Sequence, residues 1–136
     1  MADCIFCMLA NGQIPTATLY EDDEFRAILD ASPASKGHCL ILPKAHYEDA
    51  LAMPDDLLGK AHTTTKKVAG RMMKAMAADG INIVQNNKEA AGQTVFHFHI
   101  HIIPRYQGDG PMVSWKPGEL TDEVKEDILK KFADAE

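Results

Sequence analysis

The sequence predicts a single α+β domain: an antiparallel sheet of about five strands, one long helix packed on it, and a C-terminal helix. Three observations predict this fold class. Residues 54–79 carry apolar side chains at helical spacing, whereas short strand-like runs lie before and after them. Most connections between those runs are too short for a crossover, which favours antiparallel pairing. The 136 residues, 46% hydrophobic and 25% charged, have the size and balance of one globular domain over residues 1–136.

The first third of the chain predicts a short helix and three strands. DCIFCMLANGQIP predicts a cysteine-containing turn and a short helix that stops at Gly12. Residues 18–21 and 25–29 predict two strands, which an acidic turn joins. ASPASKG is a run of turn-forming residues, and HCLILP, residues 38–43, predicts a strand that Pro43 stops.

The long helix has recognisable ends. Pro54 suits a first helical position, and Asp55 and Asp56 stabilise the amino-terminal end of the helix dipole. Gly80 is expected at C′, the first position past the helix. The apolar side of the helix comprises Leu57, Leu58, Ala61, Thr65, Val68, Met72 and Met76.

Two further strands and a final helix are expected after it. Residues 81–85, INIVQ, predict one strand, and the polar, glycine-containing loop NNKEAAGQT follows. Residues 95–103 predict the last strand, which carries three histidines. The final helix is expected over residues 122–132, with Leu120, Val124, Ile128, Leu129 and Phe132 on one side.

Composition narrows the class of partner. The net charge of −6 and the pI of about 5.4 argue against binding to nucleic acid polymers or to an anionic membrane. A small phosphorylated ligand stays compatible, because one local pocket can oppose the global sign. No apolar run approaches the ~18 residues of a membrane span, and the start of the chain does not resemble a signal peptide, so a cytoplasmic protein is expected. Three cysteines, an odd number, favour thiols or a metal site over a disulfide framework.

The most informative stretch is QTVFHFHIHIIPRY, residues 93–106, in which His97, His99 and His101 alternate with apolar residues. Side chains of a strand alternate between faces, so the three rings share one face, spaced roughly 6–7 Å apart, and the apolar residues cover the core on the other. An imidazole-rich exposed face, a three-histidine metal site and nucleophilic catalysis are the alternatives. Consecutive positions of one strand splay apart, which disfavours a tetrahedral metal.

Nucleophilic catalysis explains the pattern best. A neutral imidazole attacks phosphorus near pH 7, provided that a carbonyl or carboxylate holds the proton on its other nitrogen. Neighbouring imidazoles can then protonate the leaving group and stabilise charge on the phosphate.

HFHIHII resembles the His-x-His-x-His-x-x signature of the histidine triad (HIT) family. FRAILDASPASKGHCLILPKAH, residues 25–46, is similar to the family's strand–loop–strand ending in Pro-Lys-x-His, and AGQTV is similar to its lead-in to the triad. With CIFC and GQIP, the resemblance covers residues 3–106. It implies a homodimer that contains antiparallel sheets. It also implies hydrolysis or transfer of nucleoside monophosphates, purine (AMP-like) nucleotides included, through a nucleotidyl-histidine intermediate.

The resemblance also implies roles for individual residues. His99 is the expected nucleophile and His101 the residue that assists the phosphate and the leaving group, with His38 as support. The other implied ligand contacts are Asn86, Gln93 and Thr94 to the phosphate, Asp30 to the ribose, and Phe6, Leu29 and Ala31 to the base. Simpler interpretations stay open: Asp30 as a turn former, Gln93 as a loop cap, and His62 as a solvated residue of the long helix.

A structural zinc site is the second implication. A subset of the family binds zinc through a Cys-x-x-Cys pair, the histidine after Pro-Lys-x and the first triad histidine, which here are Cys4, Cys7, His46 and His97. Such an ion would tie the N-terminus to the catalytic strand and would not act as Lewis acid. The alternative is two free thiols. Cys39, in an apolar strand, is expected in the core.

His101 stands where transferases of the family carry glutamine, so the resemblance favours hydrolysis, and the N-terminal half is closest to the nucleoside phosphoramidase branch. The alternatives are a diadenosine polyphosphate hydrolase and a non-catalytic nucleotide-binding or scaffold protein. The segment MVSWKPGELTDEV departs from the phosphoramidase pattern. Its Trp115 is expected either to face a ligand or to pack in an interface or core.

Overall fold

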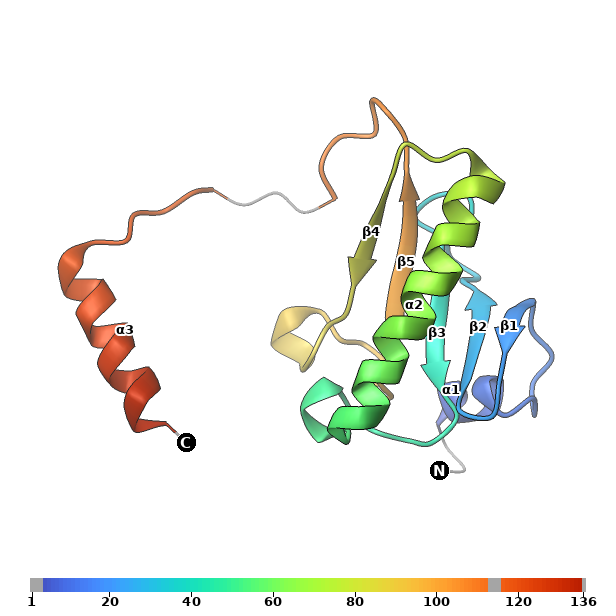
Figure 1. Cartoon of the computed structure of the whole chain (residues 1–136), viewed down its shortest axis with the longest axis horizontal. Coiled ribbons are helices and arrows are strands. Elements are labelled where there is room, and N and C mark those ends of the chain that lie inside the picture. Colours follow the sequence, from blue (N-terminus) through green and yellow to red (C-terminus); the bar gives the residue numbers. More distant parts are fainter. Residues whose placement is uncertain (1–3, 113–115, 136) are drawn as a thin grey trace.

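A five-stranded antiparallel sheet forms the body of the protein in the computed structural model, which describes residues 4–112 and 116–135 (Figure 1). The strand order is β1-β2-β3-β5-β4, so the last strand of the chain lies between two earlier ones. The α+β prediction of about five strands is therefore confirmed. The strands are β1 (Thr18–Glu21), β2 (Phe25–Leu29), β3 (Cys39–Pro43), β4 (Gly80–Val84) and β5 (Ile100–Arg105).

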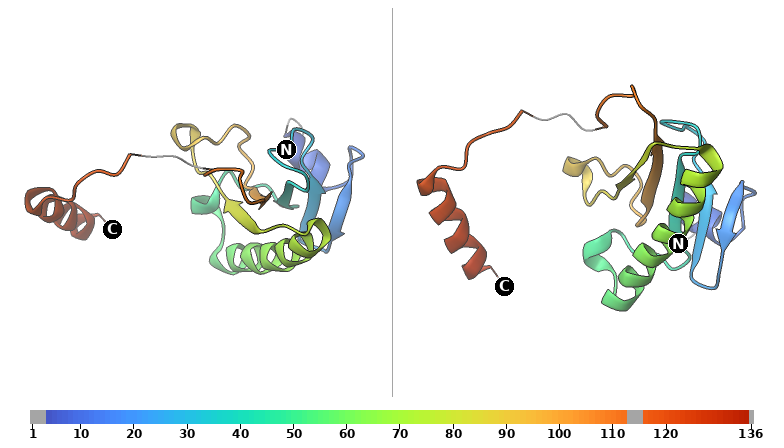
Figure 2. Two further views of the ribbon diagram at one scale, coloured as in Figure 1. Left: turned by 90° about the horizontal axis from the view of Figure 1, so that it is seen from above. Right: turned by 45° about the horizontal axis from the view of Figure 1, so that its top comes forward.

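Helices lie on both faces of this sheet. The long helix α2 (Asp55–Met76) covers one face, and the short helix α1 (Ile5–Ala10) lies on the other, as the view from above in Figure 2 shows. Two 3-10 turns, η1 (Ala50–Ala52) and η2 (Glu89–Ala91), belong to the loops between β3 and α2 and between β4 and β5. His97 and His99 alternate with residues that pack on α2, and Phe6 of α1 contacts the His99 ring on the other face of the sheet.

Helix α2 ends earlier than predicted. Ala77 takes the left-handed conformation at φ 49°, and the Ala78 N–H donates to the Met73 carbonyl 3.0 Å away, which closes the helix in a Schellman arrangement. Gly80, expected at this position, instead begins β4. At the other end Pro54 is the N-cap residue and not the first helical one.

The alternation predicted around the histidines is confirmed. Phe98, Ile100 and Ile102 are fully buried and face α2, in the cluster that includes its Val68 and Met72. Burying each of these side chains contributes about 1.5–3 kcal/mol. A second cluster forms under α1 on the opposite face; it consists of Ala10, Ile28, Leu40 and Leu42, with Phe6 and Leu9 packed against it.

The histidine strand is shorter than the predicted 95–103. Strand β5 begins at Ile100, and the Phe98 N–H donates to the Tyr47 carbonyl at 2.7 Å instead of to β3. Pro43, the last residue of β3, has no N–H to offer a partner, which explains why pairing with β3 stops at Ile100. His97 and His99 therefore precede the strand, on a segment whose Phe98 N–H bonds to Tyr47 and not to β3.

The C-terminal helix is confirmed as α3 (Asp122–Asp134), with the Thr121 hydroxyl capping its start. It stands apart from the sheet and α2 in all three ribbon views (Figures 1 and 2). Every apolar side chain predicted on its one side is exposed: Leu120, Val124, Ile128, Leu129 and Phe132. Trp115 lies outside the described residues.

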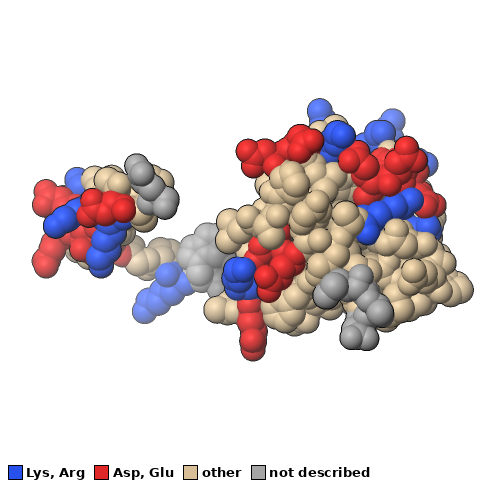
Figure 3. Space-filling model, turned by 90° about the horizontal axis from the view of Figure 1, so that it is seen from below, with Lys and Arg blue, Asp and Glu red and all other residues tan. Residues whose placement is uncertain are grey.

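The distribution of charged side chains on the surface agrees with the prediction, made from the net charge, that the protein does not bind nucleic acid polymers. On the face seen in Figure 3, the Lys and Arg side chains drawn lie among Asp and Glu side chains, and no continuous basic area forms there. Ion pairs between opposite charges also form on the surface, for example Lys44–Glu21 at 2.6 Å. Within residues 4–112 and 116–135, no helix is long and apolar enough to cross a membrane.

Candidate active site and metal centre

The backbone fixes the proton of His99. Its Nδ1 lies 2.7 Å from the carbonyl oxygen of His97, and a carbonyl can only accept, so Nδ1 carries the hydrogen. The lone pair is therefore on Nε2. Burial lowers the pKa of His99, which is only 8% exposed, and keeps the ring neutral at pH 7. This is the protonation state that a nucleophilic imidazole requires.

The tautomer of His101 is fixed indirectly, through a hydrogen bond with His38. The Ala34 N–H donates to Nδ1 of His38 at 2.9 Å, so the neutral His38 ring carries its hydrogen on Nε2. That Nε2 lies 3.0 Å from Nδ1 of His101 and 3.4 Å from the Asp30 carboxylate. Nδ1 of His101 accepts, which leaves Nε2–H as a free donor. Burial, and then the neighbouring His99 and His38 rings, lower the pKa of His101 to about 4.

Asp30, His38 and His101 bring three potential metal ligands within 4.8 Å of one another. The tautomer argues against an ion there. The hydrogen that Ala34 forces onto Nε2 of His38 points into the space that the ion would need, so the group is a hydrogen-bond relay. His38 thus lies in hydrogen-bond contact with His101, and its supporting role stays a prediction.

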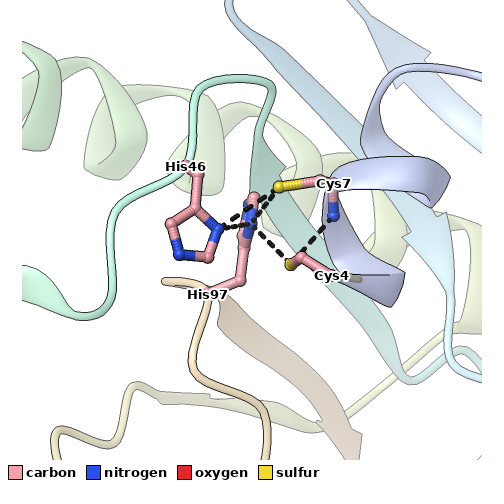
Figure 4. Close-up of side chains that lie close together, drawn as sticks. All are labelled: Cys4, Cys7, His46 and His97. Carbon is pink, nitrogen blue, oxygen red and sulfur yellow. Dashed lines mark hydrogen bonds between the residues drawn. The ribbon is translucent and has the colours of Figure 1, made fainter. Parts of the chain in front are cut away.

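A second group has the geometry of a metal centre (Figure 4). Cys4 caps the start of α1 and Cys7 lies one turn later, so both thiols point to the same side. His46 follows β3 and His97 precedes β5, and the four ligand atoms lie within 4.8 Å of one another. Nδ1 of His97 is 3.4 Å from each sulfur and 3.2 Å from Nδ1 of His46.

These distances fit tetrahedral zinc. Zinc–sulfur bonds of ~2.3 Å and zinc–nitrogen bonds of ~2.0–2.1 Å separate the ligand atoms by roughly 3.3–3.8 Å. Nε2 of His97 lies 2.8 Å from the Pro43 carbonyl and must donate to it, so the Nδ1 lone pair faces the thiols. Burial lowers the pKa of His97 to about 4, which keeps that lone pair free. Burial and the Cys4 thiol raise the pKa of Cys7, and a cation among the four would reverse this shift.

Comparison with known proteins identifies the family. A sequence model of the HIT domain matches residues 11–108. The chain belongs to the HIT family. An uncharacterised HIT-like protein of Methanocaldococcus jannaschii is 46% identical over 129 residues, 95% of this chain and 98% of that protein. The adenosine 5′-monophosphoramidase HNT1 of Saccharomyces cerevisiae is 40% identical over 122 residues, 89% of this chain and 74% of its own.

Two solved HIT structures and one further relative bear on the site. A HIT-family crystal structure from Bacillus subtilis matches with a TM-score of 0.89 at 39% identity, covering 98% of this chain and 97% of its own. A zinc-bound HIT protein of Mycobacterium smegmatis matches with a TM-score of 0.76 at 33% identity, covering 99% of both. The adenylylsulfatase HINT3 of Arabidopsis thaliana is 42% identical over 107 residues, 79% of this chain but 54% of its own length.

Gln93 of the HIT lead-in has a well-defined environment. Its buried amide accepts from the Lys88 N–H at 2.7 Å and donates to the Glu48 and Val95 carbonyls at 2.7 and 3.1 Å. These are the bonds of a loop cap, and a contact with phosphate would require one of them to be given up. Thr94, next to it, is exposed.

Asn86 lies under the same loop. Gly92, at φ +99°, passes over it so closely that a Cβ there would meet the Asn86 amide nitrogen at 3.4 Å. A residue with a side chain would strain this turn because of the positive φ, and its Cβ would only make van der Waals contact with the Asn86 amide.

The predicted ribose and base residues lie at two places beside the histidines. Leu29 is the last residue of β2, and Asp30 and Ala31 follow it; the Asp30 N–H donates to the His38 carbonyl at 3.0 Å. Leu29 and Ala31 are exposed, as a ligand-facing wall requires. Phe6 comes from α1, with its ring centroid 4.8 Å from that of His99.

The sequence did not reveal the groups that orient these side chains. Backbone atoms of three residues, Ala34, Pro43 and His97, determine the tautomers of the histidines that they contact. The type of a residue does not indicate where its backbone atoms lie, so these contacts could not be predicted. An ion pair was also missed: the buried Asp49 carboxylate lies 2.7 Å from the ammonium of Lys88, whose side chain is 56% exposed, and the pair fastens the loop before the triad. The two residues are far apart in sequence, and neither belongs to a periodic pattern.

Proposed function

We propose that this protein hydrolyses nucleoside phosphoramidates, or related nucleoside monophosphate derivatives, through a covalent nucleotidyl-His99 intermediate. At the coarser level, it is a HIT-family nucleotide hydrolase by homology. The observation that carries the finer proposal is the hydrogen bond from Nδ1 of His99 to the His97 carbonyl, at 2.7 Å. It leaves a lone pair on Nε2, beside the N–H donor of His101.

In the proposed reaction, Nε2 of His99 attacks the α-phosphorus and the bond from phosphorus to the leaving nitrogen breaks. The His97 carbonyl stabilises the positive charge that the ring acquires. The leaving nitrogen takes a proton from solvent and departs as the amine, while Nε2–H of His101 hydrogen-bonds on the leaving-group side. Water then attacks phosphorus, the bond to His99 breaks, and a nucleoside monophosphate is released. Water gives up the proton that the amine took, so the protein is unchanged over the cycle.

The nucleotide would occupy the space between α1 and the end of β2. The resemblance supports Asn86, Gln93 and Thr94 as phosphate contacts and Asp30 as the ribose contact. Phe6, Leu29 and Ala31 would contact the base. Because this proposed base wall is apolar, a purine would be held mainly by contact area.

A structural zinc ion would be held by Cys4, Cys7, His46 and His97. The fit of the four ligand atoms and the zinc-bound relative at 33% identity support this assignment. When bound, the ion would cross-link the start of α1 to the segments after β3 and before β5. It would have no open coordination position and would take no part in the reaction.

The test is turnover of a fluorogenic adenosine phosphoramidate, with amine and AMP measured separately. Multiple turnovers with equal release of both are expected. Adenylylsulfate and diadenosine polyphosphates, assayed in parallel, separate the phosphoramidase from the alternatives. Binding of AMP without turnover of any of the three would sink the proposal and favour a nucleotide-binding protein.

The homodimer that the resemblance implies has support in two unpartnered surfaces. Strand β4 is an edge strand, with Ile83 44% exposed, and residues 110–112 leave the body beside it, around a hollow of about 610 Å³. The chain then leads to α3, whose apolar side is bare, and a lone helix of this length is marginal in water. We propose that α3 packs on a second copy of this chain.

Light scattering after size-exclusion chromatography tests the dimer. The wild-type protein should be a dimer at micromolar concentration, and Ile128→Glu/Phe132→Glu should weaken the dimer by at least ~100-fold, because each change places a charge in an apolar contact. Lys130→Glu on the charged side of α3 is the matched control. A monomeric wild type, or a double variant as dimeric as the control, would contradict the proposal.

A further inference from the structure

Helix α1 links the candidate metal centre to the nucleophile. Phe6 lies between the two cysteines of this helix, and its ring meets His99 edge-to-face, with centroids 4.8 Å apart and planes at 89°. The same ring meets His97 at 6.2 Å and 76°. Both separations lie within the range in which aromatic rings attract in this geometry. Phe6 is thus in contact with the nucleophile and faces a metal-ligand candidate.

His99 needs such a contact. The hydrogen bond from Nδ1 to the His97 carbonyl fixes one point of the ring, but a ring held at one point can still rock about that bond. Rocking would move Nε2, the atom that must approach phosphorus in line. His101 also meets His99, with centroids 5.0 Å apart and planes at 68°. Phe6 and His101 therefore both restrict the movement of the ring.

Both restraints on His99 lead back to the same four residues. The carbonyl belongs to His97, and Phe6 is held by the turn of α1 that begins at Cys4 and carries Cys7. We infer that Phe6 is a positioning residue for the nucleophile, and that the Cys/His cluster sets the orientation of His99 through α1 and through the His97 backbone. The inference rests on the proposed function for its kinetic consequence only.

This role differs from that of a base-binding wall. A wall residue acts through affinity, so its loss should raise KM for purine substrates and leave kcat and smaller bases little affected. A positioning residue acts through the orientation of the attacking atom, so its loss should lower kcat by the same factor whatever the base.

The kinetic experiment compares Phe6→Leu with Leu9→Ala. Leu9 lies on the same helix and packs on the same cluster, so its variant controls for a general loosening of α1. With adenosine, guanosine and cytidine phosphoramidates, kcat of Phe6→Leu should fall roughly tenfold or more for all three, in addition to any rise in KM from the lost contact with the base. A base-dependent rise in KM alone, or an equal fall of kcat in Leu9→Ala, would overturn the inference.

Nitrogen NMR of the histidine rings provides a readout that needs no substrate. The wild type should show His99 as one tautomer with a slowly exchanging Nδ1–H. Phe6→Leu, and the wild type after its metal is removed with a chelator, should both show faster exchange of that hydrogen, whereas Leu9→Ala should not. An unchanged His99 signal in both samples would overturn the inference. A wild type without turnover would refute the proposed function and leave this spectroscopic test intact.

Discussion

Replacing His99 by alanine should lower kcat on the order of 10³-fold or more while the protein still binds AMP. The reason is specific to this ring. Its Nε2 lone pair exists because Nδ1–H is committed to the His97 carbonyl, and we propose that no other group supplies the nitrogen that attacks phosphorus. His101 offers a hydrogen on its Nε2 and its lone pair at Nδ1 is occupied by His38, so it cannot take over.

The measurement is turnover of the adenosine phosphoramidate, together with mass spectrometry of protein quenched during turnover. The wild type should carry a nucleotidyl adduct on His99, and His99→Ala should carry none. His62→Ala, an exposed histidine of α2, is the control and should keep wild-type kcat. Turnover in His99→Ala within tenfold of the wild type would refute the covalent mechanism.

Replacing Cys7 by serine should remove the metal and lower the melting temperature by roughly 10 °C or more. The ion would join three segments that are distant in sequence, and structural zinc sites contribute a large part of the folding free energy in small domains. A loss of about 3 kcal/mol in a domain of this size corresponds to that shift. Cys7 is the buried thiol of the pair, so a hydroxyl in its place would also be poorly solvated.

Metal content and thermal unfolding should be measured on the same samples. Wild-type protein prepared with zinc should contain one equivalent per chain, and Cys7→Ser should contain almost none. Cys39→Ala is the control: this thiol is buried in the core, burial raises its pKa to about 12, and its loss should leave the metal in place. A wild type that binds no zinc, or a Cys7→Ser variant as stable as the control, would contradict the assignment.

Much of the fold could be predicted because hydrophobic periodicity reports burial directly. The alternation at residues 97–102 identified the buried face of β5, and the helical spacing after Pro54 identified α2. The ends of helices and strands could be predicted less well from the sequence. Gly80 was expected to end α2, but a left-handed alanine does so, and β5 starts late because a proline in its neighbour removes a donor. Both outcomes depend on tertiary context.

The candidate site, like the fold, could be predicted only in part from the sequence. Side chains that carry chemistry could be named from the sequence, and the structure brings the four cluster residues together and places His38 beside His101. Their protonation could not be predicted, since it depends on which carbonyl or amide lies within 3 Å of each ring. Gln93 shows a further limit of residue type: an amide suited to phosphate is here bonded to the backbone of its own loop.

The position of β5 between β3 and β4 governs when, during synthesis, the protein can be completed. Until residues 100–105 have left the ribosome, one edge of β3 has no partner strand, although its side chains are among the most apolar of the chain. Cys4 is made first and His97 comes 93 residues later. A nascent chain therefore carries its Cys-x-x-Cys pair without the last candidate ligand for most of its elongation, so the proposed zinc ion could be bound by all four residues only late in synthesis.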